Sequence, residues 1–178
     1  PSSIGSFGEN VNYKRYNFRS NVDMDISPKT TVSFGIQGNV SENTEPAEGG
    51  SASIYRDIIN AAPNAFPVIL KDGRLAGRDG LNNPYNMLTQ RGYVKNISNA
   101  LRANLTVDQN LDFITEGLTA KLTYAYDYST DAADTRSRSI NFFEPTGRDE
   151  NGDLLATEWY ASSYQDYLNY SHSSSSTR

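Results

Sequence analysis

Hydrophobic and polar residues alternate along four segments of this chain, near residues 15–26, 31–42, 93–108 and 117–129. Alternation with a period of two places successive side chains on opposite faces of a β-strand. Where the alternation is strictest, the charged residues all fall in the polar set, and they are Arg19, Asp23, Asp25, Arg102, Asp108, Lys121 and Asp127. The pattern therefore predicts an all-β, antiparallel arrangement of strands that each have one apolar and one polar face.

Short and long connections alternate between these strands. Residues 27–30 form a tight turn in which Pro28 fixes the backbone, and residues 109–117 form a second short link. The other two connections are long loops, residues 43–92 and 130–178. Loops of this length inside a compact domain are uncommon unless they have a function.

Local patterns predict some order within the long loops. Ser51 to Ser53 can cap a short helix that carries Ile54, Ile58 and Ile59 on one face. The spacing of Tyr160, Tyr164, Tyr167 and Leu168 predicts a second amphipathic helix. The Ser-rich residues 171–176 are expected to be a mobile tail.

Two architectures fit strands of this kind. In the first, a soluble antiparallel sheet such as an extracellular β-sandwich turns its apolar face to a core and its polar face to water. In the second, a transmembrane β-barrel turns its apolar face to lipid and its polar face to a wet lumen. The period alone does not distinguish them.

Three features favour the barrel. The predicted strands are longer than the usual ~5–6 residues and match the ~9–11 that cross a bilayer. Short turns alternating with long loops are typical of outer-membrane barrels. The third feature is the position of several of the 12 Tyr residues, which lie at the strand ends joined to long loops. In a barrel they would form one aromatic girdle at the membrane interface, and they are Tyr16, Tyr93, Tyr124, Tyr126 and Tyr128. A single-chain barrel needs at least about eight strands, so four strands predict one part of a larger barrel.

Composition removes several classes of protein. The chain has 178 residues and no cysteine, which excludes disulfide scaffolds and thiol catalysis. A net charge of -5 gives no basic surface for nucleic acid. The single histidine, His172, lies in the Ser-rich tail, and no catalytic triad or metal cluster can be assembled around it. We therefore expect neither an enzyme nor a bound cofactor or metal.

Several short motifs resemble the barrel of SusC/RagA-type TonB-dependent transporters. They lie at residues 13–21, 25–27, 55–58, 82–85, 91–93, 104–105, 111–118 and 147–149. The resemblance covers most of residues 11–153 and implies that residues 1–178 are all part of one such barrel. That barrel has 22 strands, of which this chain would supply about four, with extracellular loops at 43–92 and 130–178 and without the N-terminal plug.

The resemblance also implies a function and partners. The family imports oligosaccharides, or in some members peptides, across the outer membrane of Bacteroidetes-type Gram-negative bacteria. Its members work with a SusD-like surface lipoprotein, and TonB, ExbB and ExbD supply the energy through the N-terminal part. The rest of the barrel and outer-membrane lipid would be the other partners. The alternatives are a TonB-dependent siderophore or cobalamin receptor, and a soluble extracellular β-sandwich that binds glycans or proteins.

Two groups of residues are candidates for contact with a substrate or partner. Charged residues of the polar face would line the lumen or meet the plug, although they could instead form cross-strand ion pairs that fix the register: Arg19, Asp23, Asp25, Arg102, Lys121 and Asp127. Aromatic residues of the loops could contact sugar or the lid protein, or could form small cores within the loops: Tyr85, Tyr93, Phe142, Phe143, Trp159, Tyr160 and Tyr164. Residues 149–153 superficially resemble a calcium loop, but Gly152 comes too early, which favours an Asn-Gly hairpin turn.

Overall fold

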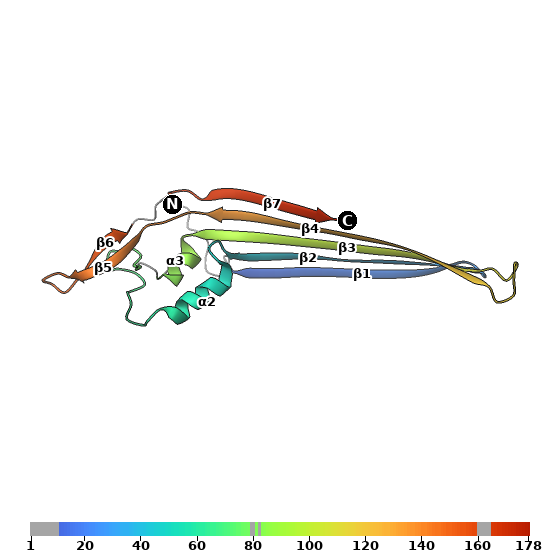
Figure 1. The fold of residues 1–178 in the computed structure, drawn as a ribbon, viewed down its shortest axis with the longest axis horizontal. Helices are drawn as coiled ribbons and strands as arrows, with labels where there is room; N and C mark the ends of the chain where they lie inside the picture. Colours follow the sequence, from blue (N-terminus) through green and yellow to red (C-terminus); the bar gives the residue numbers. More distant parts are fainter. Residues whose placement is uncertain (1–10, 79–80, 82, 160–164) are drawn as a thin grey trace. The chain divides into compact units, whose positions relative to one another are not determined.

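The computed structural model describes residues 11–78, 81, 83–159 and 165–178 of the chain. It is mostly antiparallel β-sheet, with 62% of the chain in strands and 11% in helices, which confirms the β-rich antiparallel class. A five-stranded sheet has the strand order β1-β2-β3-β4-β7 (Figure 1). No helix in the described ranges is long and apolar enough to cross a membrane.

The first four strands lie where the alternation predicts strands, and each extends beyond its predicted range at one end or both, although β4 begins two residues later than predicted. They are β1 (Asn12–Ser27), β2 (Thr30–Pro46), β3 (Gly92–Asn110) and β4 (Thr119–Ser137). Their lengths are 16, 17, 19 and 19 residues. The largest extension is at the C-terminal end of β4, where Asp131-Ala132-Ala133-Asp134 interrupts the alternation, so the sequence pattern alone ends this strand too early.

The two short connections lie at the same end of the sheet. The Asn110 backbone N–H donates to the Lys29 carbonyl at 2.8 Å, and the Gln109 side chain also donates to that carbonyl, at 3.1 Å. Within the first turn, the Ser27 hydroxyl accepts the Lys29 backbone N–H. In the second turn, Gly117 has φ +79°, a conformation that glycine adopts without steric cost.

The chain forms two compact units. We call Asn43–Asn96 and Ala133–Ser173 the loop unit, because they comprise most of the two long connections. We call Lys14–Glu42, Ile97–Ala132 and Ser174–Arg178 the strand unit, because they comprise most of the large sheet.

The loop unit contains two helices and a hairpin. The helices are α2 (Gly50–Asn60) and α3 (Pro84–Thr89), and the hairpin consists of β5 (Phe142–Arg148) and β6 (Leu154–Trp159). The buried apolar side chains come from both long segments of the sequence, and they are Ile54, Leu70, Ala76, Met87, Ile140 and Phe142. The two predicted loops are therefore one folded unit with a shared core.

Helix α2 agrees with its predicted position but not with its predicted cap or buried face. It begins after Gly49, which has φ 69° and makes no side-chain cap hydrogen bond, so the predicted cap by Ser51 to Ser53 is wrong. Ile54 is 6% exposed, whereas Ile58 and Ile59 are 53% and 80% exposed. Only the first of the three isoleucines therefore packs in the core.

The C-terminal region differs most from the sequence interpretation. The predicted mobile tail lies in a strand, β7 (Asn169–Thr177), which pairs with β4. The Tyr170 hydroxyl donates to Asp134 Oδ1 at 2.8 Å, and His172 Nδ1 lies 2.8 Å from the same oxygen. Residues 165–168, the described part of the predicted second amphipathic helix, are not helical.

Candidate functional site

The polar face of the strand unit brings together side chains from four strands. Between β1 and β2, the Thr31 hydroxyl donates to Asp25 Oδ1 at 2.8 Å. Between β3 and β4, Arg102 Nε lies 3.8 Å from Asp127 Oδ1, and Lys121 Nζ lies 3.5 Å from Asp108 Oδ1. The polar positions of the four strands therefore share one surface.

These ion pairs are exposed and long, so they contribute little stability. The side chains of Arg102 and Asp127 are 65% and 76% exposed, and those of Lys121 and Asp108 are 67% and 45% exposed. Exposed pairs of this kind contribute about 0–1 kcal/mol. The pairs join residues of neighbouring strands, which fits a role in fixing the register.

Three of the predicted polar-face residues, Arg19, Asp23 and Asp25, are not held by such ion pairs within the described residues. Arg19 and Asp23 are exposed on β1 and make no ion pair within the described part of the chain. Arg19 instead lines a shallow hollow that Arg102 also lines. The alternation predicts the residues of this face, but it does not indicate that Arg15, Arg19 and Arg102 border one hollow.

The opposite face of the strand unit carries large apolar side chains that are exposed to solvent. Among them, Leu122 is 72% exposed, Tyr16 67%, Ile26 65% and Tyr124 64%. The Phe18 ring lies so close to Gly38 that an added Cβ there would be 2.5 Å from two ring carbons. Any larger residue at position 38 would therefore force the Phe18 ring to shift.

The loop aromatics predicted to contact substrate lie in different surroundings. Phe142 is 6% exposed and belongs to the core of the loop unit. Phe143 is half-buried, and the Arg74 guanidinium lies 4.4 Å from the centre of its ring. Tyr85 and Tyr93 are half-buried, and Trp159 is paired with Phe142 in the β5–β6 hairpin. Tyr160 and Tyr164 lie outside the described residues.

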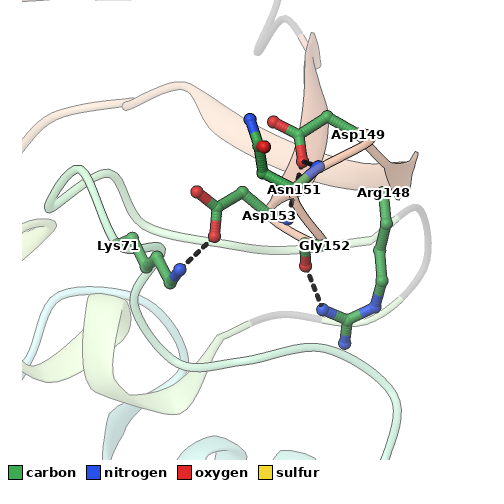
Figure 2. A network of polar contacts seen from close by, with 6 residues as sticks. All are labelled: Lys71, Arg148, Asp149, Asn151, Gly152 and Asp153. Carbon is green, nitrogen blue, oxygen red and sulfur yellow. Dashed lines mark hydrogen bonds and ion pairs between the residues drawn. The ribbon is translucent and has the colours of Figure 1, made fainter.

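The two long segments are joined by backbone and ionic contacts. The Phe143 N–H donates to the Leu75 carbonyl and the Gly77 N–H donates to the Phe143 carbonyl, each at 3.1 Å. At the tip of the hairpin, Lys71 forms an ion pair with Asp153 (Figure 2). These contacts fix the predicted loops to each other.

The hairpin tip is the Asn-Gly turn that the sequence predicts. Asp149 Oδ1 accepts the backbone N–H groups of Asn151 and Asp153 at 2.9 and 2.8 Å. Gly152 has φ +83°, and its carbonyl accepts Arg148 Nη1 at 2.7 Å (Figure 2). Asp149 and Asp153 are engaged in the turn and in the Lys71 ion pair, as a structural turn requires.

The loop unit contains a polar recess that no pattern in the sequence predicts. It has a volume of about 310 Å³, and its lining includes Glu48, Arg91, Arg138, Gln165 and Asn169. Arg91 forms an ion pair with Glu48, and burial lowers the pKa of the Arg91 guanidinium. The Arg138 guanidinium donates two 2.8 Å hydrogen bonds to Gln90.

The recess lies at the Arg91-Gly92-Tyr93 motif that contributed to the family resemblance. Gly92 has φ +99°, and an added Cβ would be 2.0 Å from the Arg136 carbonyl oxygen. Both the positive φ and the close approach of the Arg136 carbonyl favour glycine here, and the sequence alone does not show which strand approaches. The Arg91-Gly92-Tyr93 motif is therefore the only sequence signal for the recess, and it does not reveal the contact between Gly92 and the Arg136 carbonyl.

Comparison of the chain with family models, with curated proteins and with solved structures finds no match.

Proposed function

We propose that this chain is part of the β-barrel of a SusC/RagA-type TonB-dependent importer in the outer membrane of a Gram-negative bacterium. The importer takes up oligosaccharides or other large nutrients, such as peptides, with a SusD-like lipoprotein at the surface. Its mechanism is passage rather than chemistry. The loops gather the cargo, and the polar face of the barrel conducts it after the plug rearranges under the action of TonB.

One observation carries the proposal: the apolar face of the strand unit is uncovered. Its large side chains, such as Leu122 and Ile26, are exposed, whereas the buried apolar side chains of the described chain all lie in the loop unit. Soluble monomers rarely expose contiguous apolar patches larger than a few hundred Å². Lipid would cover this face favourably, because lipid tails are as apolar as the exposed side chains and barrels carry such an outward-facing apolar band.

The edges of the sheet support a larger barrel. Strands β1 and β7 are the outermost strands of the five-stranded sheet. An unpaired strand edge within hydrocarbon costs several kcal/mol for each unsatisfied N–H or C=O group. Further strands of the same barrel would pair with both edges and remove this cost.

The connections and strand lengths fit the same proposal. Strands of 16 to 19 residues exceed the ~9–11 that span a bilayer, so they can cross it and continue beyond it. Short turns join β1 to β2 and β3 to β4, whereas the segments before β3 and after β4 contain the loop unit. Long outer loops and short inner turns are typical of outer-membrane barrels.

Size-exclusion chromatography with light scattering tests the proposal on the 178-residue chain, in detergent and after removal of the detergent. We expect a defined species in detergent and aggregation without it, because the apolar face then has no cover. A chain that stays monomeric and folded without detergent would show that the apolar face needs no lipid. That result would reject the proposed barrel and favour the soluble β-sandwich.

A further inference from the structure

Three arginines border one hollow on the polar face of the strand unit. Arg15 and Arg19 come from β1 and Arg102 comes from β3, and the hollow has a volume of about 350 Å³. The rest of its polar lining consists of amide side chains, those of Asn17, Gln37 and Asn39. In the described part of the chain no carboxylate lines this hollow.

The three guanidinium groups use few of their donors on the protein. Arg15 Nε donates to Asn17 Oδ1 at 3.0 Å, and Arg102 Nε lies 3.8 Å from Asp127 Oδ1. Arg19 makes neither a side-chain hydrogen bond nor an ion pair within the described residues. Because each guanidinium carries five N–H donors, most of this donor capacity is open to a ligand.

The charge of the hollow stands out against that of the chain, which has a net charge of -5. The carboxylates Asp23 and Asp25 lie on the same strand as Arg19, but they are not part of the lining. Like charges gathered in one hollow raise the local concentration of an oppositely charged ligand. The planar guanidinium matches the geometry of carboxylate, sulfate and phosphate oxygens.

We propose that this hollow binds an acidic sugar. The arginines hold its carboxylate or sulfate group, and the amides of Asn17, Gln37 and Asn39 hold its hydroxyl groups. An amide offers both a donor and an acceptor, which suits a hydroxyl that can both donate and accept. The volume is at the lower end of the ~300–1,000 Å³ range of small-molecule sites, which suits a short saccharide unit.

This inference deepens the proposed function, since it names acidic oligosaccharides as the class of cargo. It rests on that function for the role of the polar face as the path of the cargo. Binding itself requires only that the polar face is open, whatever covers the apolar face.

Isothermal titration calorimetry on the 178-residue chain in detergent micelles tests the inference. The probes are the dimer of galacturonic acid, the neutral dimer of galactose and the dipeptide glutamyl-glutamate. We expect the acidic dimer to bind at least tenfold more tightly than either other probe, and its affinity to fall as the salt concentration rises. Equal binding of the neutral dimer, equal binding of the dipeptide, or no binding of the acidic dimer would overturn the inference.

Substitutions then locate the site. Arg19→Gln should weaken binding of the acidic dimer roughly tenfold, because it removes charged hydrogen bonds. Arg19→Lys, which keeps the charge but loses the planar fork, should have a smaller effect. Lys29→Gln is the control, because Lys29 is exposed in the turn between β1 and β2 and does not line the hollow, and it should leave the affinity unchanged.

Circular dichroism of each variant verifies that the sheet is intact. If Arg19→Gln unfolds the chain, the wild-type salt dependence and the comparison of the three probes decide the inference. Unchanged affinity in a folded Arg19→Gln variant overturns it. A chain that needs detergent but binds no acidic dimer rejects the acidic-sugar site and leaves the proposed barrel standing, whereas a chain that is monomeric without detergent rejects the barrel independently of sugar binding.

Discussion

The loop unit and the strand unit differ in how far their apolar side chains are buried. The loop unit buries Met87 at 1% and Phe142 at 6% exposure, using residues from both long segments of the chain. The strand unit leaves Leu122 at 72% and Ile26 at 65% exposure, although it contains most of the four longest strands in the described chain. The loop unit therefore supplies its own hydrophobic stabilisation, whereas the strand unit leaves its large apolar side chains uncovered by the described residues.

The same contrast applies to the polar groups. In the loop unit, the Asn83 side chain is fully buried and donates to the carbonyls of Val68 and Ala76 at 2.8 and 2.7 Å. In the strand unit, polar side chains such as Lys121 and Arg102 are exposed and form long ion pairs. Burial thus makes individual polar groups structurally important in the first unit, while exposure leaves them free for ligands in the second.

The largest effect should come from opening the core of the loop unit. Phe142→Ala removes a buried ring and leaves a cavity, which should lower the free energy of unfolding by about 3–5 kcal/mol. Phe113→Ala is the control, since Phe113 is 70% exposed, and it should change stability by less than about 0.5 kcal/mol. Urea unfolding in detergent measures both. Similar losses in the two variants would mean that the loop unit has no core of its own.

The next largest effect should come from a charge on the apolar face of the strand unit. If lipid covers this face, Leu122→Arg should cost about 2–4 kcal/mol near the bilayer midplane. Thr123→Arg places the same charge on the polar face and should cost less than about 1 kcal/mol. Urea titration of the chain folded into lipid vesicles compares the two variants, and equal costs would contradict the assignment of the two faces.

Two buried asparagines of the loop unit should respond in opposite directions to the same substitution. Both polar atoms of the Asn86 amide are buried with no hydrogen-bond partner among the described residues, so Asn86→Leu should raise stability by about 1 kcal/mol. Asn83→Leu should lower it by about 1–3 kcal/mol, because it leaves two carbonyls unpaired and removes the cap of α3. Thermal unfolding measures both changes, and a loss of stability in Asn86→Leu would show that its amide is satisfied.

The ion pairs of the polar face should contribute little. A double-mutant cycle with Asp108→Asn and Lys121→Gln should give a coupling energy below about 1 kcal/mol, because both side chains are well exposed. Added salt should reduce it further. A coupling energy of several kcal/mol would mean that water is excluded from the polar face of the strand unit.

The smallest effect is a pH dependence at the β3–β4 turn. Hydrogen bonding to the Asn110 side chain, and the Gly117 N–H at 2.8 Å, lower the pKa of Asp112. The ionised form is therefore favoured in the folded turn. Its contribution is complete above the unfolded pKa of about 3.9 and is lost as the pH falls through the lower folded pKa. NMR titration of the Asp112 carboxyl carbon measures this, and Asp112→Asn should abolish the pH dependence.

The strands of the strand unit could be predicted because their information is local. Alternation from Tyr16 to Ile26 reports two different environments on the two sides of one strand, whatever those environments are. The cross-strand contacts Thr31–Asp25 and Lys121–Asp108 join positions that the alternation placed on the polar face. The hollow of Arg15, Arg19 and Arg102 needs the order of the strands as well, which the alternation does not contain.

The loop unit and β7 could not be predicted in the same way. The pairing of Ala76 with Phe143 joins residues far apart in the sequence, so no local pattern reports it. The Ser-rich strand β7 has no apolar face to produce a period. It forms because its backbone pairs with the edge of β4, and because Tyr170 and His172 hydrogen-bond to Asp134.

The sheet order also has a consequence for the order of folding. Strands β1 and β2, and β3 and β4, are joined by short turns, so these pairs can form quickly at low entropic cost. Pairing of β4 with β7 must first close the segment 138–168, and pairing of β2 with β3 must close the segment 47–91. Docking of these two segments to each other shortens both closures at once. Folding of the loop unit should therefore set the rate at which the two hairpins join into one sheet.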